Sequence, residues 1–174
     1  TSGDAMTLHQ VLAARFSAIQ APDTLHERLS NTCEDLALVA GLDDLRSRWG
    51  ALSNRSMASL EAGDDAGSER SDADAAEIAD RLDIPGAPWR AQFTHARQLT
   101  WHGDPRAAQR QGRRAFATGQ AAGEEEAGSI FNPQLYLILW NEGRLTEVAG
   151  ALASMPLQLP LDRAFACHAY AYLP

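Results

Sequence analysis

The feature that most constrains the fold of this chain is a glycine that recurs every 40 residues in the same kind of setting. Gly63, Gly103 and Gly143 lie in the stretches "LEAGDDA", "LTWHGDPRAAQ" and "LWNEGRLTE". Glycine just beyond the last turn is a common helix stop, and in the second stretch Asp104 can cap a new helix with Pro105 in its first turn. Evenly spaced helix stops predict a repeating pair of helices.

Apolar residues spaced three and four apart between these stops predict amphipathic helices. Trp49 and Trp89 keep the 40-residue spacing near the start of two of them, and Thr24 with Glu27 predicts a capping box for another. The predicted helices comprise residues 6–20, 24–41, 45–62, 71–83, 88–102, 105–122, 129–142 and 144–154, with a further helix from near Asp162.

Four segments carry more specific expectations. In the helix over 24–41, the apolar stripe includes Leu29, Cys33 and Leu36, and Cys33 is expected to be a small buried hydrophobe. In the helix over 105–122, alanines and glycines line one side, so that a neighbouring backbone can approach closely. The helix over 129–142 is apolar nearly all round, which predicts burial on both sides. Residues 61–74 are the most polar stretch, and we interpret them as an enlarged acidic loop inside one pair.

The composition agrees with helices that pack closely. Hydrophobic residues make up 45% of the chain but aromatic ones only 7%, and alanine, a strong helix former of small volume, dominates. We therefore expect an all-α fold, a right-handed α-solenoid of antiparallel helix pairs that is tetratricopeptide-like with a period of about 40 residues.

The charge and the motifs exclude several classes of function. A net charge of −8 and an isoelectric point near 5.0 argue against direct nucleic-acid or membrane binding, because those partners require a cationic surface. The chain has no lysine, which excludes a Walker lysine or a Schiff-base lysine. It also has no HExxH, no GxSxG and no glycine-rich phosphate loop, so we expect no enzyme and no cofactor.

The histidines, the cysteines and the distribution of apolar residues predict a cytoplasmic protein without a metal site. The five histidines are scattered without metal-ligand spacing, and Cys33 and Cys167 are too isolated to suggest a disulfide framework or a zinc knuckle. No segment has the length and hydrophobicity of a membrane span, and the first residues lack the pattern of a signal peptide.

Two groups of residues are candidate binding sites. Arg106, Arg110, Arg113 and Arg114 form a basic patch on one helix, which can hold an acidic partner or a phosphate or can simply be a solvated face. If the first helix of each pair lines a concave face, that face carries a polar and aromatic groove for a ligand. Its residues are Arg55, His95, Arg97, Gln98 and Tyr136. For the aromatic residues Trp101, Tyr136 and Trp140, packing in the core is the favoured role, because large aromatics supply most of the volume in an alanine-rich stack.

Several stretches resemble a known family. The words "GQAAGEEEA" and "QLY" followed by "EGRL" are similar to the tetratricopeptide-like repeat region of bacterial MalT/LuxR-type ATP-dependent transcriptional regulators and of related actinobacterial regulators that join a cyclase to an ATPase. The similarity covers essentially the whole chain. It implies that residues 1–174 form a single helical-repeat domain, a fragment of a larger multidomain regulator whose ATPase, cyclase or DNA-binding domains lie elsewhere in the full-length chain. The 40-residue units depart from the strict 34-residue tetratricopeptide signature, so groove residues are not transferred position by position.

Two functions therefore remain open. The first is a non-catalytic module that recognises a protein or small effector on its concave face and passes the signal to an output domain. The second is a structural spacer or self-association scaffold that binds no small ligand, which includes a homo-oligomer.

Overall fold

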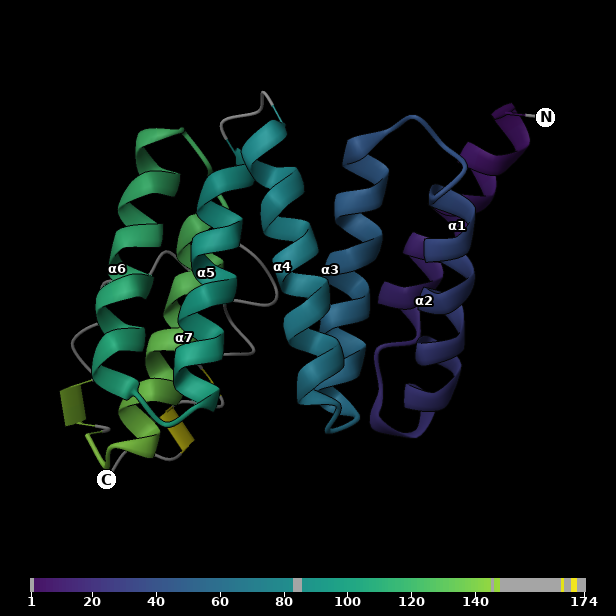
Figure 1. The fold of residues 1–174 in the computed structure, drawn as a ribbon. Helices are drawn as coiled ribbons and strands as arrows, with labels where there is room; N and C mark the ends of the chain where they lie inside the picture. Colours follow the sequence, from purple (N-terminus) through teal and green to yellow (C-terminus); the bar gives the residue numbers. More distant parts are fainter. Residues whose placement is uncertain (1, 83–85, 145, 148–166, 168–169, 172–174) are drawn as a thin grey trace. The chain divides into compact units, whose positions relative to one another are not determined.

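The computed structural model describes residues 2–82, 86–144, 146–147, 167 and 170–171, and within these ranges the regular elements are all helical (Figure 1). The chain divides into two compact units, Thr1–Ala87 and Pro88–Pro174, and each is described by itself. The helices predicted over 144–154 and from near Asp162 lie outside the described residues, apart from a few positions. The all-α class expected from the sequence is confirmed.

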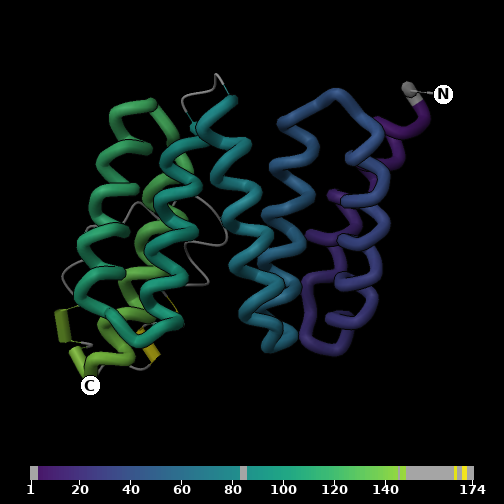
Figure 2. Tube along the Cα trace, viewed as in Figure 1, coloured from purple at the N-terminus to yellow at the C-terminus, as the bar shows by residue number. Residues whose placement is uncertain are grey.

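In the first unit the chain folds up and down through neighbouring antiparallel helices, as the trace in Figure 2 shows. Helix α2 packs against α1 and α3, and α4 packs against α3. A short 3-10 turn, Pro22–Thr24, joins α1 to α2. The helices are α1 (Ser2–Ala18), α2 (Leu25–Val39), α3 (Leu45–Glu61) and α4 (Asp65–Arg81).

The second unit is built from α5 (Gly86–Trp101), α6 (Pro105–Ala121) and α7 (Ala127–Asn141), with α5 counted from Pro88 onward. Trp89 and Phe93 of α5 pack edge to face with ring centroids 5.2 Å apart, and they belong to one buried cluster with Phe131 of α7. The predicted seam of small residues on α6 is confirmed, because its members are buried where α5 and α7 approach: Ala108, Gly112, Ala115 and Gly119.

The repeated glycines are helix stops, as predicted. Gly63, Gly103 and Gly143 have φ values of 74°, 77° and 69°, in the left-handed region that glycine adopts at little cost. The residue after each glycine donates its backbone N–H to a carbonyl five positions earlier, at 2.8 to 2.9 Å. Gly123 does the same with φ 76°. These four glycines end α3, α5, α6 and α7, whereas α4 is followed by Leu82 in an extended conformation. Helices α3 to α7 end at 20-residue intervals, at Glu61, Arg81, Trp101, Ala121 and Asn141.

The acidic loop predicted over residues 61–74 is wrong, because α4 begins at Asp65. The side chain of Asp64 caps this helix by accepting the Gly67 N–H at 2.9 Å. Small polar residues of α4, such as Ser68, are buried against α3, where the Ser68 and Ser56 hydroxyls are 3.0 Å apart. A face of small residues packs closely even when it is polar, provided that its hydroxyls find partners.

Several burial predictions are also wrong. Cys33 is exposed instead of buried, and Trp101 at the end of α5 is 56% exposed. On α7, Leu137 is 56% exposed, so this helix is not buried all round. The predicted capping box is absent, because the Thr24 hydroxyl donates to the Ala21 carbonyl at 2.8 Å instead of capping α2.

Candidate functional site

The candidate site is an open groove of about 740 Å³ between α6 and α7 in the second unit. One stripe of each helix lines it, and Phe116 of α6 stacks on Phe131 of α7 with ring centroids 4.9 Å apart. Leu135 and Leu139 extend this apolar floor along α7. The lining residues follow helical spacing along two neighbouring helices, so the groove is elongated. An elongated groove of this kind has a shape suited to another helix.

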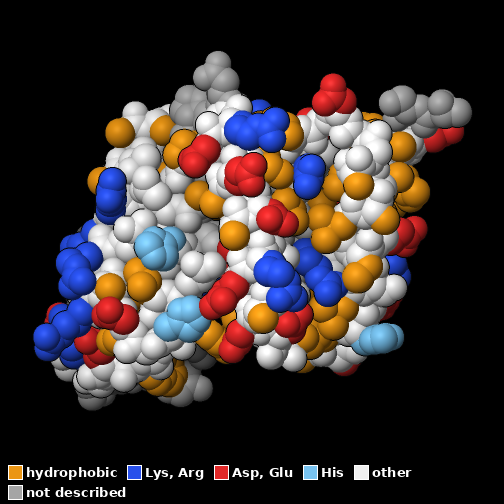
Figure 3. Space-filling view, viewed as in Figure 1, with side chains coloured by type: hydrophobic (Ala, Val, Ile, Leu, Met, Phe, Trp, Pro, Cys, Tyr) orange, Lys and Arg blue, Asp and Glu red, His pale blue; other side chains and the backbone are white. Residues whose placement is uncertain are grey.

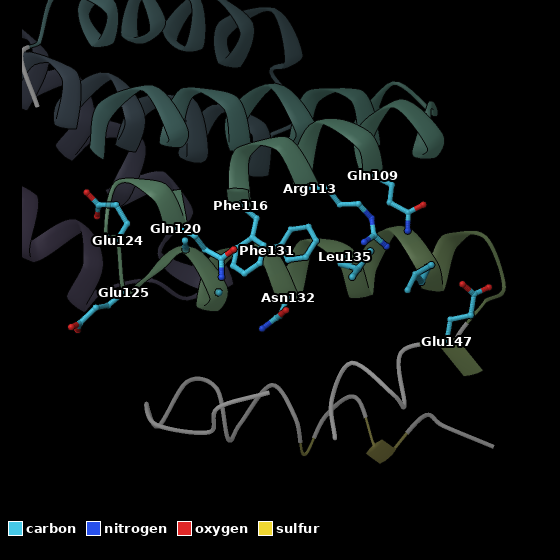
Figure 4. Close-up of a pocket in the computed structure, with 14 residues that line it drawn as sticks. Gln109, Arg113, Phe116, Gln120, Glu124, Glu125, Phe131, Asn132, Leu135 and Glu147 are labelled. Atoms are coloured by element: carbon cyan, nitrogen blue, oxygen red, sulfur yellow. The ribbon is translucent and has the colours of Figure 1, made fainter. Parts of the chain in front are cut away.

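Charged side chains lie toward both ends of the groove. Figure 4 shows Arg113 of α6 and Glu147 toward one end and Glu124 and Glu125, which follow α6, toward the other. No ion pair within the described residues involves Arg113, Glu124 or Glu125. These charges are therefore available to orient an elongated partner.

The predicted basic patch lies on the exposed side of α6. All four of its arginines are exposed: Arg106, Arg110, Arg113 and Arg114. In Figure 3 blue side chains gather over α6 at the left of the view. One of them, Arg113, also lines the groove, so the patch and the groove form one continuous surface.

The structure places the five residues of the predicted concave groove in different surroundings. Arg55 of α3 reaches α2 of the first unit, where its Nη1 lies 3.1 Å from the Cys33 sulfur and 3.3 Å from the Leu29 carbonyl oxygen. The other four lie in the second unit: His95 is exposed, Arg97 and Gln98 are half-buried, and Tyr136 is 3% exposed and packs edge to face on Trp140. No contact between described residues brings all five together, and this groove stays a prediction.

The first unit contains a second feature that the sequence pattern missed, a buried polar layer on α2. Its members are Arg28, Asn31, Thr32 and Asp35, which face the core together with Val39. The Asn31 amide donates to the Leu12 carbonyl at 2.9 Å, and Asp35 Oδ1 lies 2.7 Å from His9 Nδ1 on α1. Their spacing of three and four residues was the available signal, since it places them on one helical face.

Arg28 is the centre of this layer, because its side chain is 1% exposed and yet charged. Its guanidinium donates to both carboxylate oxygens of Glu61, with the Nη1 to Oε1 distance at 2.9 Å, and lies over the Phe16 ring. The hydrogen bond to Glu61 raises the pKa of Arg28, and the same bond lowers the pKa of Glu61. A buried charge that is paired in this way positions α2 against α3.

Other side chains also form local structure. Asp44 caps α3, and the hydrogen bond from the Ser47 hydroxyl, 2.6 Å away, lowers the pKa of the Asp44 carboxyl. Among the described residues, no group of three or more His, Cys, Asp or Glu side chains could hold a metal ion. No helix in the described part of the chain has both the length and the hydrophobicity needed to cross a membrane.

Comparison with protein-family models, with curated proteins and with solved structures finds no match to this chain. Any statement about function therefore depends on the groove and on the surfaces around it.

Proposed function

We propose that this chain is a non-catalytic interaction or effector-sensing module of a multidomain signalling or transcriptional regulator in the cytoplasm. The observation that carries the proposal is the open groove between α6 and α7, in which an apolar floor lies between charged ends. Helix-binding grooves combine these features, because the floor supplies affinity and the charges fix the orientation of the partner.

The architecture that we propose for this module is the right-handed, tetratricopeptide-like α-solenoid expected from the sequence. The 20-residue interval between helix ends supports it, since stacked helix pairs of constant length keep their turns in register. In such a stack each new helix packs against two preceding helices. A groove between two helices is then the natural place for a further helix.

A second candidate function is a self-association scaffold. The observation that favours it is the outer face of α1, where Leu8 and Val11 are 42% and 55% exposed. Large apolar side chains that lie together on a surface commonly mark an interaction site.

The proposal is tested with helical peptides selected from a displayed library on the purified protein. Asn132 lies on the groove side of α7, whereas Asn141 at the end of the same helix is exposed and outside the groove. We expect Asn132→Arg to weaken the selected peptides by about tenfold, because the loss of even one well-packed contact is worth roughly 1.4 kcal/mol. Asn141→Arg should leave their affinity unchanged. If no selected peptide distinguishes the two variants, the groove is not a docking site.

A further inference from the structure

The outer face of α1 carries a stripe of exposed side chains. Asp4, Leu8, Val11 and Arg15 follow each other at steps of four, three and four residues, which places them on one side of the helix. All four are exposed, whereas Phe16 of the same helix is buried in the core. The stripe therefore presents an acid, two apolar side chains and a base in that order.

The two apolar side chains in the middle of the stripe form an exposed pair. Leu8 and Val11 lie one helical turn apart. The other large apolar side chains that the described residues expose are far apart in the sequence: Trp101, Leu137 and Tyr170. Adjacent apolar side chains on a surface indicate contact with a partner more strongly than single ones do.

The surroundings of the stripe suit a second helix. Steps of four and three residues are those of the seam in a coiled coil. Beside the stripe α1 exposes the small side chains of Thr7 and Ala14, which let a second helix approach closely. The stripe thus has both the spacing and the room for a helix of a partner.

The order of the stripe makes it complementary to itself when two copies run antiparallel. Leu8 of each α1 then faces Val11 of the other, and Asp4 faces Arg15. Both pairings occur together, because Asp4 precedes Leu8 by the same four residues by which Arg15 follows Val11. A parallel pair would instead set Asp4 against Asp4 and Arg15 against Arg15, which like-charge repulsion opposes.

We propose that this face of α1 docks the same face of a second copy of the chain, with the two helices antiparallel across a two-fold axis. The proposal rests on the second candidate function given above, self-association through α1. The contact is isologous, since one stripe meets itself, and it closes after two copies. One helix from each copy makes a small interface, so the association is weak and concentration-dependent.

The charged ends of the stripe are compatible with this contact. No ion pair within the described residues involves Asp4, whereas Arg15 pairs with the exposed Glu27 of α2. A guanidinium has five N–H donors, so Arg15 can hold Glu27 of its own chain and Asp4 of the second copy together.

The first test compares two aspartate substitutions by sedimentation velocity over a wide range of protein concentration. Val11→Asp places a charge in the proposed contact, and Leu137→Asp places one on α7 at a side chain of nearly equal exposure, 56% against 55%. We expect Val11→Asp to weaken self-association by about tenfold or more, since an apolar contact is lost from both halves of the interface. Leu137→Asp should leave it unchanged, and circular dichroism should show both variants to be as helical as the wild type.

The second test reverses charges. Asp4→Arg and Arg15→Glu should each weaken self-association by about threefold or more, because like charges then meet at both ends of the contact. Asp74→Arg, at an exposed acid of α4, changes the net charge by the same amount as Asp4→Arg and should lack this effect. Mixing the Asp4→Arg and Arg15→Glu variants should restore association, since both ends of the mixed dimer pair opposite charges. The double variant should associate for the same reason.

Three results would overturn the proposal, and they differ in what else they remove. A wild-type protein that stays monomeric at every concentration removes the scaffold function as well. An association that Val11→Asp does not affect uses another surface, so the scaffold function remains without this contact. If Val11→Asp weakens association but mixing the charge variants does not restore it, α1 is a self-association face with a different arrangement. The groove is tested separately, by the dependence of peptide binding on Asn132.

Discussion

Two glycines on α6 should respond in opposite ways to the same substitution. Gly112 and Gly119 are both buried in the seam of small residues, and both lie in helical backbone. Replacing either with alanine adds helix propensity of about 0.8 to 1.0 kcal/mol, because glycine loses more backbone entropy on folding. The difference between the two variants therefore measures only what the new methyl group meets.

The surroundings of the two methyl groups differ. At Gly119 a Cβ atom would stand 2.8 Å from the Cβ of Ala127 and 3.3 Å from the Trp89 ring, and neither neighbour can turn away, because one is fixed to the backbone and the other is buried. At Gly112 the nearest atom is Gln134 Oε1 at 3.3 Å, the end of a flexible side chain. Overpacking of a core costs about 1 to 3 kcal/mol. After the gain in helix propensity of about 1 kcal/mol is subtracted, Gly119→Ala should be neutral to about 2 kcal/mol destabilising.

Gly112→Ala should keep the full gain in helix propensity and be about 1 kcal/mol stabilising, which sets the expected gap between the variants at about 1 to 3 kcal/mol. Urea unfolding followed by circular dichroism measures this gap directly. For a unit of this size each kcal/mol corresponds to about 4 to 8 °C in melting temperature. Equal stability of the two variants would show that α6 does not approach α7 and Trp89 as closely as described.

Three further substitutions test other parts of the fold. Gly103→Ala should destabilise the protein by about 1 to 2 kcal/mol in urea unfolding, because alanine is strained at φ 77°, and Gly103→Asn should cost less. In a Cys167→Ser background, the exposed Cys33 should react stoichiometrically with a thiol reagent in the native state, and protection until unfolding would contradict its exposure. Because Arg28 holds the pKa of Glu61 below its usual value, the contribution of this pair is present at neutral pH and lost as pH falls through the lowered pKa, below about 4.3. Wild type should accordingly be more stable than Glu61→Gln at pH 7 and lose that advantage in acid; a constant difference across pH would refute the pairing.

The helix boundaries could be predicted because they depend on local chemistry. A glycine stop such as Gly103 and a cap such as Asp104 act within one turn, so they are visible in a short stretch of sequence. The start of α4, residues 65–70, was missed because its buried side consists of small polar residues, and its stability depends on contacts with α3 that no local pattern reveals.

Which side of each helix faces the core was harder to predict. The apolar stripe on α2 suggested that Leu29 and Cys33 are buried, whereas Arg28, Asn31 and Asp35 take that place. Their partners come from α1 and α3, so the arrangement depends on contacts between residues up to 33 positions apart. The groove was missed for a related reason, since Phe116 and Phe131 are ordinary core residues by pattern and only the packing of α6 on α7 makes them line a groove.

The helix contacts of the two units differ in chemistry, and this difference bears on function. In the first unit Arg28 requires Glu61, Asn31 requires the Leu12 carbonyl and Asp35 requires His9, so α2 cannot shift by one turn without leaving buried polar groups unpaired. We infer that this layer fixes the register of α1 to α3. The groove of the second unit instead offers aromatic and leucine side chains, which accept different apolar surfaces at similar cost. An adaptable apolar groove of this kind suits the docking function proposed above.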